Sequence, residues 1–244
     1  MIAVYGVPDQ QKDLFSAFKR LSETGAVPAR AKTAGHKDGW GILIYHVGKP
    51  RYLGREPNDP LKGSGYDRAV EEIEMVRPQI IIGHLRKASF GGNSIENTQP
   101  FLDSEWSFAH NGTIYSPGLK RVGTENDSRA YFRKLLNRLP SSNVESALAD
   151  TVKKLRRDIT DRSDESRRTY SSLTCLLSDG KSIYALRDFS DEAERSYYTM
   201  YYSLLQDGIV FCQEKIIEGT WEEIPNRTLA AFHPGENVRL VPCD

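Results

Sequence analysis

The stretch 80–114 limits most strongly what this chain can fold into, because it joins two apolar runs through a loop and places polar residues where each run ends. Three isoleucines at 80–82 predict a buried strand that delivers Arg86 to its end. A second run, 106–110, stops at Asn111-Gly112, a pair that tolerates positive φ and favours a tight turn. If the two strand ends lie side by side, a guanidinium, an amide and free N–H groups form a carboxylate clamp beside a candidate oxyanion hole.

Each of these pieces also has a simpler interpretation. An Asn-Gly pair after an apolar run is most often a hairpin turn and nothing more. A single arginine at a strand end, such as Arg86, is most often a surface residue or an ion-pair partner. The functional interpretation therefore depends on the rest of the chain.

Apolar periodicity predicts several helices and many strands without regular alternation between them. Helical spacing occurs within 10–22, 69–76, 127–136 and 144–160. Strand patterns occur at 1–7, 41–47, 51–55, 80–83, 106–110, 171–177, 182–187, 197–204, 209–213, 229–232 and 238–241. A wound parallel sheet would alternate more strictly. We expect an α+β fold in which two mainly antiparallel sheets pack face to face and helices cover the outer faces, a four-layer αββα sandwich built as one domain over 1–244.

Composition excludes several classes of partner. Lys+Arg and Asp+Glu balance at 33 each, which argues against nucleic acid or an anionic membrane surface. No apolar run reaches membrane-spanning length, and the start of the chain lacks the basic region of a signal peptide. The three cysteines form no CxxC pair, and we expect buried, inert thiols in a cytoplasmic protein. The five histidines show no ligand spacing, so we expect no metal and no cofactor.

The motifs taken together are more specific than any one of them. They are His36-Lys37-Asp38-Gly39-Trp40-Gly41, His84-Leu85-Arg86-Lys87-Ala88-Ser89, Asn97-Thr98-Gln99-Pro100-Phe101, Ala109-His110-Asn111-Gly112 and Asp127-Ser128. In this order and at these spacings the chain resembles the class II glutamine amidotransferases of the N-terminal-nucleophile hydrolase fold, and is most similar to their stand-alone, single-domain branch. The motifs span residues 36–128, and the second half of the chain matches more weakly.

The resemblance implies a role for each matched position. Arg86 corresponds to the residue that holds the α-carboxylate of glutamine, and Asp127 to the carboxylate that holds its α-amino group. The Asn111 side chain and the Gly112 N–H correspond to the oxyanion hole. Ser89 occupies a position that is usually polar near the substrate. The alternative role for Asp127 is that of a helix N-cap, and the two roles are compatible.

One position departs from the family. Its nucleophile is an N-terminal cysteine, exposed by removal of the initiator methionine, and here Ile2 stands at that position. Isoleucine has no nucleophilic atom, and a large second residue also disfavours removal of Met1. The resemblance thus implies that the substrate-binding residues and the oxyanion hole are present and that the nucleophile is missing.

Three hypotheses follow for the function. The first is a catalytically impaired protein that binds glutamine or a γ-glutamyl compound. The second is an active amidohydrolase, or an amidotransferase subunit, that uses another nucleophile. The third is a non-catalytic interaction module. The joint presence of Arg86, Asn111, Gly112 and Asp127 favours the first two, and the missing cysteine favours the first. Any transfer reaction would require a partner synthase subunit.

Overall fold

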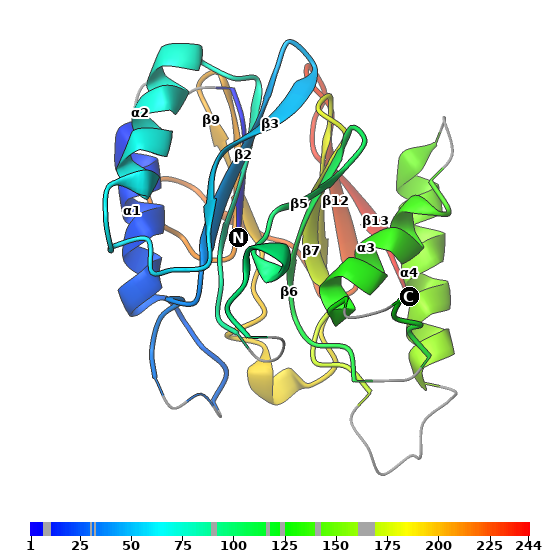
Figure 1. The fold of residues 1–244 in the computed structure, drawn as a ribbon. Helices are drawn as coiled ribbons and strands as arrows, with labels where there is room; N and C mark the ends of the chain where they lie inside the picture. The colour runs from blue at the N-terminus through cyan, green and yellow to red at the C-terminus, as the bar shows by residue number, and fades with distance from the viewer. Residues whose placement is uncertain are drawn as a thin grey trace.

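Two antiparallel sheets lie face to face, and helices cover both outer faces (Figure 1). This computed structural model describes residues 1–6, 11–29, 31, 33–88, 92–115, 118–122, 125–139, 143–160 and 169–244. The layering confirms the predicted four-layer αββα sandwich.

The first sheet has seven strands in the order β11-β9-β10-β1-β4-β2-β3. Their bounds are β1 Ile2–Tyr5, β2 Trp40–His46, β3 Lys49–Glu56, β4 Ile80–Leu85, β9 Tyr201–Leu205, β10 Gly208–Cys212 and β11 Glu222–Glu223. The isoleucine-rich β4 is buried along its whole length, between β1 and β2. A strand that is apolar on both faces fits this central position, where it packs against helices on one side and the second sheet on the other.

The second sheet has six strands in the order β13-β12-β8-β7-β6-β5. Their bounds are β5 Phe101–Asp103, β6 Trp106–Asn111, β7 Thr174–Ser178, β8 Ile183–Arg187, β12 Thr228–Phe232 and β13 Arg239–Pro242. β7, β8 and β12 are buried throughout.

Two pairs of helices form the outer layers. α1 (Gln11–Thr24) and α2 (Gly65–Val76) cover the seven-stranded sheet, and α3 (Asp127–Leu136) and α4 (Val144–Thr160) cover the six-stranded sheet (Figure 1). Short 3-10 turns occur at Ile95–Asn97 and Glu192–Glu194. In the described part of the chain, no helix is long and apolar enough to cross a membrane.

Strand alternation decides which side chains face the space between the sheets. On β4, Ile80 and Ile82 belong to the apolar cluster between the sheets, whereas Ile81 and Leu85 belong to the cluster under α1 and α2. Gly83 also faces the helices: a Cβ built on it would lie 2.7 Å from Cγ2 of Ile2. By the same period of two, residues 84 and 86 point between the sheets.

The sequence predictions of the elements largely agree with the structure. The helix expected at 144–160 coincides with α4, and the expected strands correspond to β1–β4, β6–β10, β12 and β13. The two shortest strands, β5 and β11, were not predicted. The charged loop expected at 161–168 lies outside the described residues.

Candidate functional site

A cavity of about 80 Å³ opens between the sheets, where β4 and β6 end. Arg86, Asn111, Gly112 and Asp127 all line it. They come from the end of β4, the end of β6 and the first turn of α3, so the fold brings together segments that are up to 41 residues apart in sequence. Ser89, the remaining predicted substrate contact, lies outside the described residues.

Arg86 is held by its backbone on both sides. Its N–H donates to the Gly39 carbonyl at 2.8 Å, and its carbonyl accepts from the Asp38 N–H at 2.9 Å. Its Nη1 donates to Oδ1 of Asn93 at 3.1 Å. Burial lowers the pKa of Arg86, while nearby Asp38 acts in the opposite direction. An arginine keeps its charge despite such a shift, so a planar cation lines the cavity.

Asn111 ends β6 with its side-chain amide oriented by a tyrosine. The hydroxyl of Tyr197 donates to Oδ1 of Asn111 at 3.0 Å, which orients the amide nitrogen away from that contact. Burial raises the pKa of Tyr197, so its hydroxyl stays protonated and able to donate. Tyr197 lies 86 residues from Asn111 and also lines the cavity, and it was not predicted from the sequence.

Gly112 follows at a point where the chain leaves no room for a side chain. A Cβ on Gly112 would lie 2.0 Å from the Ser172 carbonyl oxygen and 2.8 Å from Nε2 of His110. Any larger residue would displace the backbone that carries the candidate oxyanion N–H. The glycine here therefore serves close packing, whatever its role in chemistry.

Asp127 is buried, and one of its oxygens is already bound. Oδ2 accepts from the Ile114 N–H at 2.7 Å. The interpretation of Asp127 as the N-cap of its helix is wrong: Asn126 is the N-cap, and its Oδ1 accepts from the Arg129 N–H at 2.8 Å. Asp127 instead occupies the first helical turn, where the helix dipole favours a negative charge.

The two residues that open the chain face opposite ways. Met1 lines the cavity, and its nitrogen donates to Oε1 of Gln213 at 3.2 Å. Ile2 is fully buried in the cluster under α1, near Phe18 and Gly83, and is not among the residues that line the cavity. The Ile2 side chain thus lies on the helix side of β1, and the Met1 residue lies at the cavity.

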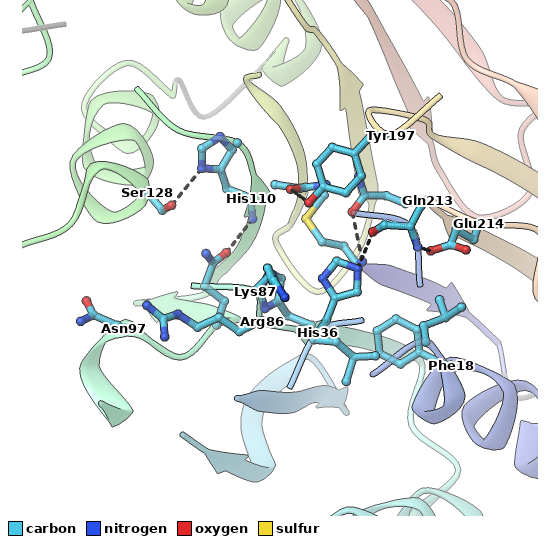
Figure 2. Close-up of a pocket in the computed structure, with 18 of the residues that line it drawn as sticks. Phe18, His36, Arg86, Lys87, Asn97, His110, Ser128, Tyr197, Gln213 and Glu214 are labelled. Atoms are coloured by element: carbon cyan, nitrogen blue, oxygen red, sulfur yellow. Dashed lines mark hydrogen bonds between the residues drawn. The ribbon is translucent and has the colours of Figure 1, made fainter. Parts of the chain in front are cut away.

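Both signs of charge surround the cavity. Arg86 and Lys87 supply cations, and Asp127 and Glu214 supply carboxylates. Figure 2 shows Arg86 and Asn97 on one side of the view, and Tyr197, Gln213 and Glu214 on the other. Such a lining suits a zwitterion, whose carboxylate and ammonium groups need opposite partners.

The described residues contain no group of three or more His, Cys, Asp or Glu that could hold a metal ion. The three cysteines are buried, and none lines the cavity. Burial raises the pKa of Cys175 to about 12 and that of Cys243 to about 11. A thiol with so high a pKa is a poor nucleophile at neutral pH.

The sequence and the fold of the chain match a known family of proteins. The family model of the class II glutamine amidotransferases matches residues 16–202, and the chain belongs to this family. An uncharacterized protein of Methanocaldococcus jannaschii is 26% identical over 238 residues, which cover 83% of this chain and 63% of that protein. The candidate glutamine amidotransferase YafJ of Escherichia coli K12 is 33% identical over 130 residues, 49% of each chain.

Solved structures agree with the layering. The structure of a glutamine aminotransferase class-II domain protein from Silicibacter pomeroyi superimposes with a TM-score of 0.67 at 17% identity, covering 99% of this chain and 97% of that one. At 17% identity this similarity is evidence for the fold alone. The chain spans less than two thirds of the length of either curated relative.

Proposed function

We propose that this protein binds glutamine or a γ-glutamyl compound in the cavity between the sheets. The observation that carries the proposal is the convergence of Arg86, Asn111, Gly112 and Asp127 on that one cavity. In the proposed complex, Arg86 receives the α-carboxylate in a bidentate contact and Asp127 receives the α-amino group. The Nδ2 of Asn111 and the N–H of Gly112 donate to the side-chain carbonyl oxygen.

We further propose that the protein is catalytically impaired. Amide cleavage by this family starts from a cysteine thiol, and Ile2 offers none. Among the described residues, no cysteine lines the cavity, so none is placed to substitute for the missing thiol. The role that fits is a glutamine-responsive sensor or a subunit of a complex. If an amide nitrogen is transferred at all, we assign the acceptor site to a partner synthase subunit.

One observation favours an active amidohydrolase as the second candidate. The Ser128 hydroxyl lies 2.9 Å from Nδ1 of His110, and Nε2 of His110 lies 3.0 Å from the Ser172 carbonyl. A carbonyl only accepts, so Nε2 carries the proton and Nδ1 can accept from Ser128, as in a nucleophile and its base. Both residues line the cavity, but the His110 ring stacks on Phe108 on the α3 side of β6, whereas Asn111 leaves the other face of that strand. We therefore rank this candidate second.

Calorimetric titration with glutamine and glutamate, run beside a glutaminase assay, tests both candidates. Binding without turnover supports the impaired protein, and turnover that Ser128→Ala abolishes supports the second candidate. Absence of both binding and turnover refutes both, and leaves a non-catalytic interaction module. In the same titrations, Arg86→Lys tests the carboxylate contact and Arg51→Lys is its matched control. Arg51 lies on the edge strand β3, pairs with Glu72 and does not line the cavity.

A further inference from the structure

His84 is a cavity residue to which the family comparison gave no role. It lies on β4 two residues before Arg86, so both side chains leave the strand on the face between the sheets. Its side chain is 5% exposed, and it lines the same cavity as Arg86 and Asn111. The strand therefore presents an imidazole and a guanidinium side by side to whatever fills the cavity.

One ring nitrogen of the buried His84 has no hydrogen-bond partner, whereas the rings of His110 and His36, which also line the cavity, are both hydrogen-bonded. The unpaired nitrogen of His84 is Nδ1, which is fully buried. By contrast, His110 uses both ring nitrogens, on Ser128 and on the Ser172 carbonyl, and Nε2 of His36 bonds the Ala26 carbonyl at 2.9 Å. Buried polar atoms almost always have a partner, so a residue that lines the cavity and leaves a ring nitrogen unpaired is a candidate ligand contact, made through the edge of the ring that faces the cavity.

The surroundings of His84 keep its ring neutral. Burial lowers its pKa well below the usual value, and the Met1 amino group, His36, Arg86 and His110 lower it further. A neutral imidazole offers one donor and one acceptor. A carboxamide also offers both a donor and an acceptor, so it complements a neutral imidazole. A cationic group of a ligand would be repelled here by Arg86 and the Met1 amino group.

The spacing along β4 fits the length of the proposed ligand. Two residues of a strand span about 6.6 Å. The four C–C bonds between the α-carboxylate carbon of glutamine and its side-chain amide carbon, each about 1.5 Å, span roughly 5 Å when extended. An amino acid whose carboxylate is held at Arg86 can thus bring its side-chain end group to His84.

We propose that His84 hydrogen-bonds the side-chain amide of the bound ligand and thereby selects five-carbon amino acids that carry an amide over those that end in a methyl group. This inference rests on the proposed function, since it takes the α-carboxylate to be held by Arg86. His84 would act beside the oxyanion donors, at the opposite end of the ligand from the Arg86 and Asp127 contacts.

The test compares L-glutamine with L-norvaline, which has the same five carbons and no amide, by calorimetry on the wild type and three variants. For His84→Leu we expect glutamine affinity to fall by about three- to tenfold, the value of one hydrogen bond, while norvaline affinity stays unchanged. We expect the melting temperature of this variant to stay level or rise, because an unpaired buried nitrogen has been removed. His84→Asn keeps a polar atom near Nδ1 and should restore part of the glutamine affinity. His46→Leu, the same substitution at an exposed position on β2, is the matched control.

Two results would overturn the proposal. One is unchanged glutamine affinity in His84→Leu, and the other is an equal loss for glutamine and norvaline. If the wild-type protein binds neither amino acid, the proposed function itself fails and the inference fails with it. If His84→Leu does not fold, NMR of the histidine ring nitrogens in the wild-type protein replaces it. The proposal then requires that glutamine shifts the His84 signal and that norvaline does not.

Discussion

The opposite orientations of Met1 and Ile2 lead to a prediction about restoring chemistry to this cavity. Two variants place a cysteine at the start of β1. In Ile2→Cys, removal of Met1 leaves the cysteine at position 2 as the first residue. In the second variant, Met1→Cys is preceded by one added Met, whose removal leaves a cysteine in the place of Met1. Removal is favoured in both variants, because the residue after the initiator is small.

The structure predicts different stabilities for the two variants. Ile2 is fully buried against Phe18 and Gly83, and a cysteine there has two side-chain heavy atoms fewer. At about 0.8 kcal/mol per buried methylene, plus the cavity left behind, we expect a loss of about 2–3 kcal/mol. For a chain of this length that corresponds to a fall in melting temperature of about 4–12 °C. Met1→Cys leaves Ile2 in place and should cost less.

The structure also predicts different activities. A cysteine in the place of Met1 has its side chain on the cavity face of β1 and its α-amine beside Gln213, where the amine can serve as base. The side chain of a cysteine at position 2 instead leaves β1 on the face that packs against the helices. A displacement of about 1 Å can cost roughly 100-fold in rate, so we expect Met1→Cys to show weak glutaminase activity and Ile2→Cys at least about 100-fold less.

Glutamate release from glutamine, measured by a coupled enzyme assay, follows the reaction, and mass spectrometry confirms which residue is first. Adding Arg86→Ala should abolish any turnover. If the trimmed Ile2→Cys variant is as active as the trimmed Met1→Cys variant, strand alternation does not govern this position. If both variants bind glutamine and neither turns it over, the oxyanion donors are not placed for catalysis.

Four further tests address single features of the site. Arg86→Lys should weaken amino-acid binding by about 1.5–3 kcal/mol in calorimetry, through loss of a bidentate charged contact; a lower melting temperature at unchanged affinity would make Arg86 structural. Asp127→Asn should remove the preference for glutamine over its desamino analogue, and equal wild-type affinities for the two ligands would exclude the α-amino role. Tyr197→Phe, which frees the Asn111 amide to rotate, should weaken glutamine binding about two- to tenfold with little change in melting temperature; unaltered affinity would show that Asn111 needs no such support. Native protein at pH 8 should resist iodoacetamide because burial raises the pKa of Cys175 to about 12, and rapid modification of any cysteine, read by mass spectrometry, would reopen the search for a substitute thiol.

Much of the fold could be predicted because its signals are local. The run at 80–82 could only be a buried strand or a piece of a buried helix, and flanking turn residues decided for the strand. The periodicity of α4 specified its full length. β11 escaped prediction because two exposed residues, Glu222–Glu223, carry no pattern. Asn126 and Asp127 are both good capping residues, so sequence alone could not choose between neighbours.

The site was harder to predict, since its parts are defined by contacts between distant segments. Arg86 and Asn111 were recognisable from their motifs, yet nothing in their spacing showed that Tyr197 would hold the Asn111 amide. Nor could sequence show which face of β1 receives Ile2, because that depends on how β1 pairs with β4. The missing partner of His84 becomes visible only when every neighbour is in place.

The central position of β1 has a consequence for how the protein reaches its native state. The first strand of the chain pairs with β4 on one side and with β10 on the other, some two hundred residues later. A ribosome adds about 5–20 residues each second, so roughly ten seconds or more pass between the synthesis of β1 and that of β10. Non-local pairings of this kind slow folding, and the apolar edge of β1 stays open in the meantime. We therefore expect nascent chains that stop before β10 to depend on chaperones, and those that extend past β10 to be released from them.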